Sequence, residues 1–236
     1  MRVISSAILA VGMIVGGWLV TEGLKDIRTG DRYVTVKGMA ERDVEADLAI
    51  WPLRYVAASD HLEQAQADIQ RSRDAVERFL GKYGMTPEQI ELQRLDVTDT
   101  TTNPYQSQPS PNRFIISHTL LLRSESPEKV RAASQAISEL IDAGVVLSSD
   151  YGPSGPTYLF KGLNEIKPEL IAEATAAARA SAEQFAKDAN ATLGGLRRAN
   201  QGVIQILPRD QGAGLGEESQ ASKTVRVVST LEYYLH

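Results

Sequence analysis

Hydrophobic and polar residues alternate in several short stretches of the chain, and this period of two predicts β-strands. The predicted strands lie at residues 33–37, 48–58, 90–100, 113–123, 145–150, 156–161, 196–207 and 223–235. Apolar residues three and four positions apart instead predict helices at residues 61–82, 127–143 and 168–189. Gly38 interrupts the first strand. Pro52 cannot donate a backbone hydrogen bond, so it indicates that the second strand lies at a sheet edge or contains a bulge.

The predicted order of elements is ββα, ββα, ββα, ββ. Paired strands between single helices favour antiparallel hairpins with the helices packed on one face of the sheet. We therefore expect an α+β fold with about three helices on an antiparallel sheet, and not a doubly wound parallel sheet. The segment "RDQGAGLGEESQAS", residues 209–222, predicts a flexible loop between the last two strands.

The N-terminal segment predicts a transmembrane helix. Residues 3–20 carry no charge, and a helix needs about 20 apolar residues to cross a bilayer core. Trp18 suits the membrane interface, and the residues after it lack the small pair that precedes a signal-peptide cut. We expect a retained anchor, with residues 1–30 as anchor and juxtamembrane segment and residues 31–236 as the folded domain.

The positions of Lys and Arg around this segment bear on its orientation. Arg2 alone precedes it, whereas Lys25, Arg28 and Arg32 follow it closely. Because the flanking side richer in Lys and Arg stays in the cytoplasm, this count by itself favours a cytoplasmic folded domain.

Composition excludes several classes of protein. The formal net charge is -5, from 25 basic and 30 acidic residues that are spread along the chain. This leaves no basic field to attract a phosphate backbone, so we expect no nucleic-acid partner. The absence of cysteine from the sequence excludes disulfides, thiolate catalysis and cysteine-ligated metal.

Four acidic residues alternate with other residues just after the first strand pattern: Glu41, Asp43, Glu45 and Asp47. In an extended segment they point to one side, where they form either a cation ladder or a solvated edge that discourages aggregation. A calcium site needs about 6 to 8 oxygen ligands, and the D-x-D-x-D-G pattern that supplies them is missing. We favour the solvated edge and predict no metal site, with the cation ladder as the weaker alternative.

The remaining patterns do not indicate catalysis. His61, His118 and His236 are far apart, and none has a second histidine or a cysteine two to four positions away. "YGPSG" lacks the G-x-S-x-G of a nucleophile elbow, and "QGAGLGEE" lacks the G-x-G-x-x-G of a phosphate-binding turn. We therefore predict no catalytic residues and no cofactor, and an enzyme is disfavoured.

Four segments carry a resemblance to a known family: "DRYVTVKGMAERDVEADLAIWPL", "GMTPEQIE", "EATAAARASAEQFAKDANATLG" and "KTVRVVSTLEYYL". They resemble the SIMPL-domain proteins, exported or membrane-anchored proteins of bacteria. The resemblance implies an α+β SIMPL fold, a periplasmic or cell-envelope location, self-assembly, and links to stress tolerance without a defined reaction. The family offers no active-site residues to carry over. Its implied location is opposite to the one that the Lys and Arg count favours.

We hypothesise a noncatalytic protein anchored in the bacterial inner membrane by one N-terminal helix, with its main domain in the periplasm. It acts through self-association or other envelope proteins, in envelope stress tolerance, and a strand edge near Pro52 or the final strand supports assembly. The alternative is a periplasmic hydrolase or small-ligand-binding protein with a pocket between sheet and helices. Converging polar groups in a deep pocket favour that alternative, whereas a filled interface favours the scaffold.

Overall fold

The computed structural model describes residues 13, 16–18, 32–102, 111–148, 155–210, 212 and 216–236. The predicted membrane segment, residues 3–20, thus lies outside the described residues except for Met13 and residues 16–18, which are helical. Within the described ranges, no helix has the length and apolar character needed to cross a membrane.

The chain has an α+β fold, as the sequence pattern predicted. The strands are β1 (Tyr33–Glu45), β2 (Leu48–Ser59), β3 (Ile90–Asp99), β4 (Phe114–Ser124), β5 (Val146–Leu147), β6 (Thr157–Leu159), β7 (Leu193–Gln201), β8 (Gln205–Pro208) and β9 (Ser222–Leu235). The helices are α2 (Leu62–Lys82), α3 (Pro127–Gln135), α4 (Ser138–Asp142) and α5 (Leu163–Asp188), with short 3-10 turns η1 (Pro87–Gln89), η2 (Thr100–Thr102) and η3 (Glu217–Ser219). The second predicted helix is divided into α3 and α4, and α5 begins ahead of the predicted start at Pro168.

The strands form two sheets. One has the order β1, β9, β7, with β8 also paired to β9, and the other has the order β3, β4, β2, β5, with β6 also paired to β2. β3 and β4 form an antiparallel hairpin, as predicted. The expected hairpins of β1 with β2 and of β5 with β6 are wrong, because β1 and β2 belong to different sheets and β5 and β6 each pair with β2.

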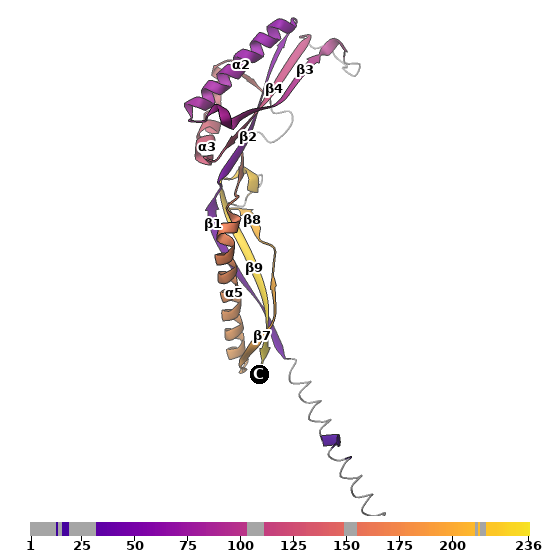
Figure 1. Cartoon of the computed structure of the whole chain (residues 1–236), viewed down its shortest axis with the longest axis vertical. Helices are drawn as coiled ribbons and strands as arrows, with labels where there is room; N and C mark the ends of the chain where they lie inside the picture. Colours follow the sequence, from indigo (N-terminus) through magenta and orange to yellow (C-terminus); the bar gives the residue numbers. More distant parts are fainter. Residues whose placement is uncertain are drawn as a thin grey trace, which may run out of the picture. The chain divides into compact units, whose positions relative to one another are not determined.

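The chain divides into two compact units. Unit 1 consists of Met1–Arg42, Lys167–Gln205 and Arg226–His236, and unit 2 consists of Asp43–Ile166 and Ile206–Val225. In unit 1, α5 lies along β1 and β9 (Figure 1). Its buried face repeats every fourth residue and is made almost entirely of alanine: Leu170, Ala174, Ala178, Ala182 and Ala186. The alanine-rich segment therefore gives a thin helix face that packs closely on the sheet.

Gly38 explains how close this packing is. A Cβ atom at Gly38 would lie 2.0 Å from the carbonyl oxygen of Ala174 and 2.3 Å from the nitrogen of Ala178. The strand β1 continues through Gly38, so the expected interruption is wrong. Glycine is needed here because the helix backbone occupies the space of a side chain.

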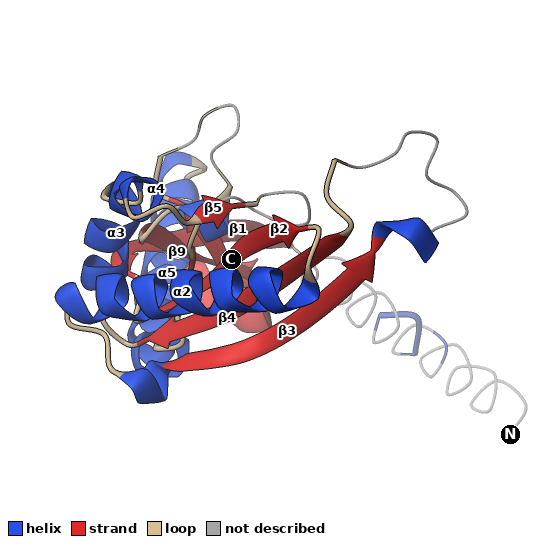
Figure 2. Cartoon of the chain, turned by 90° about the horizontal axis from the view of Figure 1, so that it is seen from above, coloured by secondary structure: helices blue, strands red, loops and turns tan. Residues whose placement is uncertain are grey.

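In unit 2, the helices α2, α3 and α4 cover one face of the sheet, and α2 lies in front of β4 in Figure 2. Trp51, Leu53 and Tyr55 point from β2 into this interface, and each is at most 2% exposed. They pack with Leu120 and Leu122 of β4 and with apolar residues of the helices. Alternate residues of the same strands face the other side of the sheet, which the helices leave uncovered.

Pro52 lies in a central strand that pairs with β4 in unbroken register, so both expectations, a sheet edge and a bulge, are wrong. β6 pairs with residues 48–50 of β2 and β5 pairs with residues 55–56, so Pro52 falls between them. The carbonyl of Arg54 accepts a hydrogen bond from the Ser148 N–H at 2.9 Å on that side. Because alternate residues of a strand direct their backbone groups the same way, the missing N–H of Pro52 faces the same interval. Proline is tolerated there because neither β5 nor β6 needs a donor from it.

Candidate functional site

The acidic residues of β1 are matched to donors on β9. In unit 1, Arg226 donates to the carboxylate of Glu41. In unit 2, Thr224 Oγ1 donates to Asp43 at 2.7 Å, and Ser222 Oγ donates to Glu45 at 2.8 Å. The two-residue spacing of the acids thus follows the two-residue spacing of the donors, and the side chains pair across neighbouring strands.

Asp47 has a different role, because it lies beyond the end of β1. Its carboxylate accepts the backbone N–H of Lys161 at 2.9 Å and of Gly162 at 2.8 Å, directly before α5 begins. A carboxylate is favourable beside the unpaired N–H groups and positive dipole end of a helix. Over the described ranges, no three His, Asp or Glu side chains are grouped closely enough to hold a metal ion. Together with the three pairs between β1 and β9, these contacts of Asp47 give each of the four acidic residues of the predicted ladder a hydrogen-bond donor within the protein.

The interface between the sheet of unit 2 and its helices is filled at its centre by the core described above. At its margins are two hollows of about 390 and 240 Å³. A larger groove, of about 1080 Å³, lies on the opposite face of the sheet, which the helices do not cover. The groove is therefore not the pocket between sheet and helices that the alternative hypothesis of a hydrolase or small-ligand-binding protein requires.

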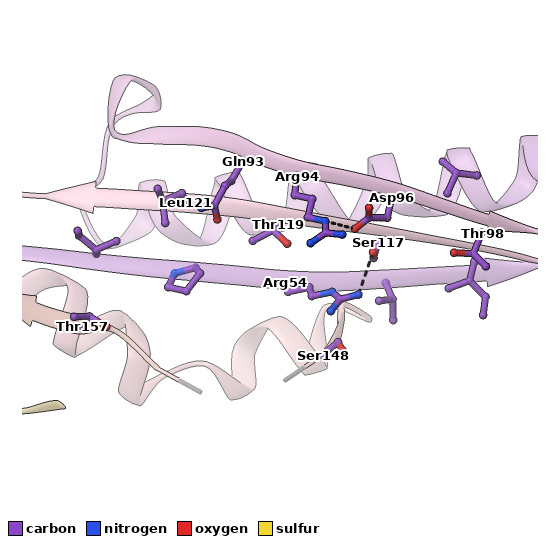
Figure 3. A pocket seen from close by; sticks show the side chains of 15 residues that line it. Arg54, Gln93, Arg94, Asp96, Thr98, Ser117, Thr119, Leu121, Ser148 and Thr157 are labelled. Carbon is purple, nitrogen blue, oxygen red and sulfur yellow. Dashed lines mark hydrogen bonds and ion pairs between the residues drawn. The ribbon is translucent and has the colours of Figure 1, made fainter. Parts of the chain in front are cut away.

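The strand register places charged and hydroxyl side chains in a row across this groove. Arg54 of β2 is opposite Thr119 of β4, and Thr119 is opposite Arg94 of β3. Arg54 donates to Ser117 Oγ at 3.3 Å, and Arg94 Nε lies 2.7 Å from Asp96 Oδ2. Figure 3 shows Thr119 between the two arginines, with Arg54 directed to Ser117 and Arg94 to Asp96. Polar groups thus converge on the open face of the sheet.

The sequence interpretation did not single out these groove residues. The available signal was the alternation within the two predicted strands, where Arg54 precedes the buried Tyr55 and Thr119 precedes the buried Leu120. Polar residues on the second face of a strand usually indicate contact with water. Only the pairing of β2, β4 and β3 shows that they meet.

His118 is a titratable group inside the core of unit 2. It is 7% exposed, and its Nδ1 lies 3.4 Å from the hydroxyl of Tyr55. Burial, together with the positive charge of Arg73, lowers the pKa of His118 below its usual value. Burial also raises the pKa of Tyr55 to about 12, so the phenol stays protonated. The pair is therefore neutral at neutral pH.

This burial predicts a loss of stability in mild acid. Below about pH 6.5, the unfolded chain takes up a proton at His118 more readily than the folded chain does. The free energy of unfolding should therefore fall as the pH drops below this value, until the folded protein also binds the proton. Urea unfolding at several pH values between about 7.5 and 5.5 measures the slope of the free energy of unfolding against pH. His118→Phe should reduce the slope, and an unchanged slope would contradict the role given to His118.

The comparisons with known proteins say little about activity. No curated protein matches the chain. Among solved structures, an uncharacterized conserved protein from Listeria innocua shares 11% identity over 83% of this chain and 92% of that chain, with a TM-score of 0.18. A hydrolase from Listeria innocua shares 10% identity over 83% of this chain and 91% of that chain, with a TM-score of 0.17. TM-scores this low do not allow any property of these two proteins to be transferred to this chain.

A family model described as "SIMPL: Protein of unknown function (DUF541)" matches residues 34–232. The matched range begins within β1 and ends within β9, so it includes all or most of each described strand and the helices from α2 to α5. The resemblance found in the sequence is confirmed, and the chain belongs to the SIMPL family.

Proposed function

We propose that this protein is a noncatalytic SIMPL protein that is held in the bacterial inner membrane by residues 3–20 and acts in the periplasm by association with protein partners. The uncharged N-terminal segment supports the anchor. The resemblance to exported and anchored proteins supports the periplasmic side and a role in envelope stress tolerance. A second copy of the chain is the first partner, and the free edge of β3 is the contact surface.

The observation that carries the association is the exposed edge of β3. This strand is ten residues long and ends its sheet, since β4 is its one partner among the described strands. On the side of the sheet that carries the helices, Leu92, Leu95 and Val97 remain 42%, 53% and 56% exposed. A long edge strand with exposed apolar side chains pairs readily with another strand. The contact surface thus lies on β3, and not near Pro52 or on the final strand.

The charges of β3 favour a second copy as the partner. Two β3 strands related by a two-fold axis at Leu95 would place Arg94 opposite Asp96 of the second copy, and Asp96 opposite Arg94. The same register would bring the two Leu95 side chains together on one face. Opposite charges directly across a strand pair are favourable, and the symmetry supplies this contact twice. Gln93, where β3 has a bulge, lies outside this central pairing.

A charge exchange tests this register. Arg94→Asp should place two acids opposite each other, and Asp96→Arg should place two bases opposite each other, so each variant should lower the fraction of dimer about tenfold or more. The double variant should restore the dimer. The measurement is the mass of the full chain in detergent by light scattering, with detergent mass subtracted.

Arg78→Asp is the matched control, because Arg78 is an exposed residue of α2 outside the β3 edge. It should leave the mass unchanged. Exposed ion pairs contribute about 0 to 1 kcal/mol, so neither single variant should unfold the chain. A monomeric wild-type protein would contradict the proposed interface. So would a dimer whose mass stays the same in all these variants.

A further inference from the structure

We propose that the groove on the uncovered face of unit 2 binds a small organic anion, with a carboxylate or phosphate group held between Arg54 and Arg94 above Thr119. This inference does not depend on association through β3. The proposed site lies on the face of the sheet that does not pack against the helices. No covalent step is involved.

The geometry follows from the strand register. Neighbouring strands lie about 4.8 Å apart, so the Cα atoms of Arg54 and Arg94 on either side of β4 are about 10 Å apart. Two arginine side chains from these positions can reach one anion from opposite sides, and the Thr119 hydroxyl between them can donate a third hydrogen bond. A guanidinium offers planar paired donors that match carboxylate and phosphate oxygens.

Charge favours an anion at this place. Acidic residues clearly outnumber basic ones in unit 2 as a whole. Among the described residues, the charged side chains that line the groove are instead those of two arginines, Arg54 and Arg94, and one acid, Asp96. The described lining of the groove is therefore more basic than the unit as a whole, which favours an anionic group over a cationic one.

The apolar residues on both sides of the row formed by Arg54, Thr119 and Arg94 favour an organic ligand. Ile50, Pro52 and Leu121 line the groove on one side of the row, and Val56 and Ile115 line it on the other. The volume of about 1080 Å³ is comparable to that of small-molecule sites, which are about 300 to 1,000 Å³. An apolar body beside the anionic group would cover these walls, which a bare inorganic anion would leave in contact with water.

The test uses the full chain in nanodiscs of zwitterionic phosphatidylcholine, which do not themselves attract anions. Isothermal titration calorimetry compares phenyl phosphate and phenylacetate with uncharged 2-phenylethanol. We expect at least one anion to bind about tenfold or more tightly than the alcohol, because hydrogen bonds to a charged group are worth more than those to a neutral one. The tighter anion identifies the head group as phosphate or carboxylate.

Variants connect binding to the named residues. Arg54→Gln and Arg94→Gln should each lower the affinity for the tighter-binding anion about 10- to 100-fold. Thr119→Val should lower this affinity less. Arg78→Gln removes the same charge on α2, behind the sheet, and should have no effect. Failure of both anions to bind, equal binding of the alcohol, or equal losses in the Arg54 and Arg78 variants would each overturn the site. Since Arg54 lies on the central strand β2, its variant should leave the dimer mass unchanged, which separates this test from that of the β3 edge.

Discussion

Gly38→Ala is expected to lower the free energy of unfolding by about 3 kcal/mol, which is at the upper end of the cost of overpacking a core. The new Cβ atom would overlap the carbonyl oxygen of Ala174 and the nitrogen of Ala178. Both are backbone atoms of α5, so no rotamer change can relieve the overlap. Either the helix must move away from β1, or the strand must bend.

Gly195→Ala is the matched control, since Gly195 is also a strand glycine of unit 1 and a Cβ atom there meets nothing within 4 Å. Urea unfolding of both variants measures the difference. If Gly38→Ala unfolds at the same urea concentration as wild type, β1 and α5 do not pack as closely as described.

The second large effect is expected at an ion pair whose lysine is buried and whose glutamate is partly exposed. The side chain of Lys223 is fully buried, and its Nζ contacts the carboxylate of Glu217 and donates to the Glu217 carbonyl at 2.6 Å. Glu217→Ala leaves this ammonium without its counter-charge and should destabilise the protein by about 3 kcal/mol. Lys223→Met removes the charge and keeps the length of the side chain, so it should cost much less, because apolar replacements of buried ions are often neutral.

Glu218→Ala provides the control for this pair. Glu218 is the next residue of η3 and is exposed, so its loss should change stability by less than about 0.5 kcal/mol. Thermal unfolding of the three variants gives the order of stability. A Glu217→Ala protein as stable as Glu218→Ala, or a Lys223→Met protein less stable than Glu217→Ala, would show that the pair does not act as a buried charge and its counter-ion.

Local patterns predicted the elements of this fold well. The alternation in β2 and β4 and the apolar residues three and four positions apart in α2 depend on neighbours in sequence, and the structure confirms these elements. The division into two sheets was not predictable in this way, because pairing depends on residues far apart in the chain. The loop expected to be flexible contains η3, whose Glu217 is fixed by a lysine that the sequence interpretation treated as part of a strand pattern.

The groove shows why the candidate site was harder to predict than the fold. Simple alternation from Leu92 would place Arg94 and Asp96 on the same side as Leu92. The bulge at Gln93 shifts the register, so that Leu92 and Leu95 share one face and Arg94 and Asp96 lie on the other. One inserted residue thus creates both the apolar strip of the β3 edge and the charged side of the groove.

A single cysteine at position 95 gives the most direct test of the proposed association. The chain has no native cysteine. In the two-fold register, the Cα atoms of the two residues at position 95 would be about 4.5 to 5.5 Å apart, which suits a disulfide. In intact cells, Leu95→Cys should give a covalent dimer on a nonreducing gel, because the periplasm is oxidising, whereas Val203→Cys at an exposed site of unit 1 should not. A Leu95→Cys protein that stays monomeric, even when isolated membranes are treated with an oxidant, would contradict association through β3.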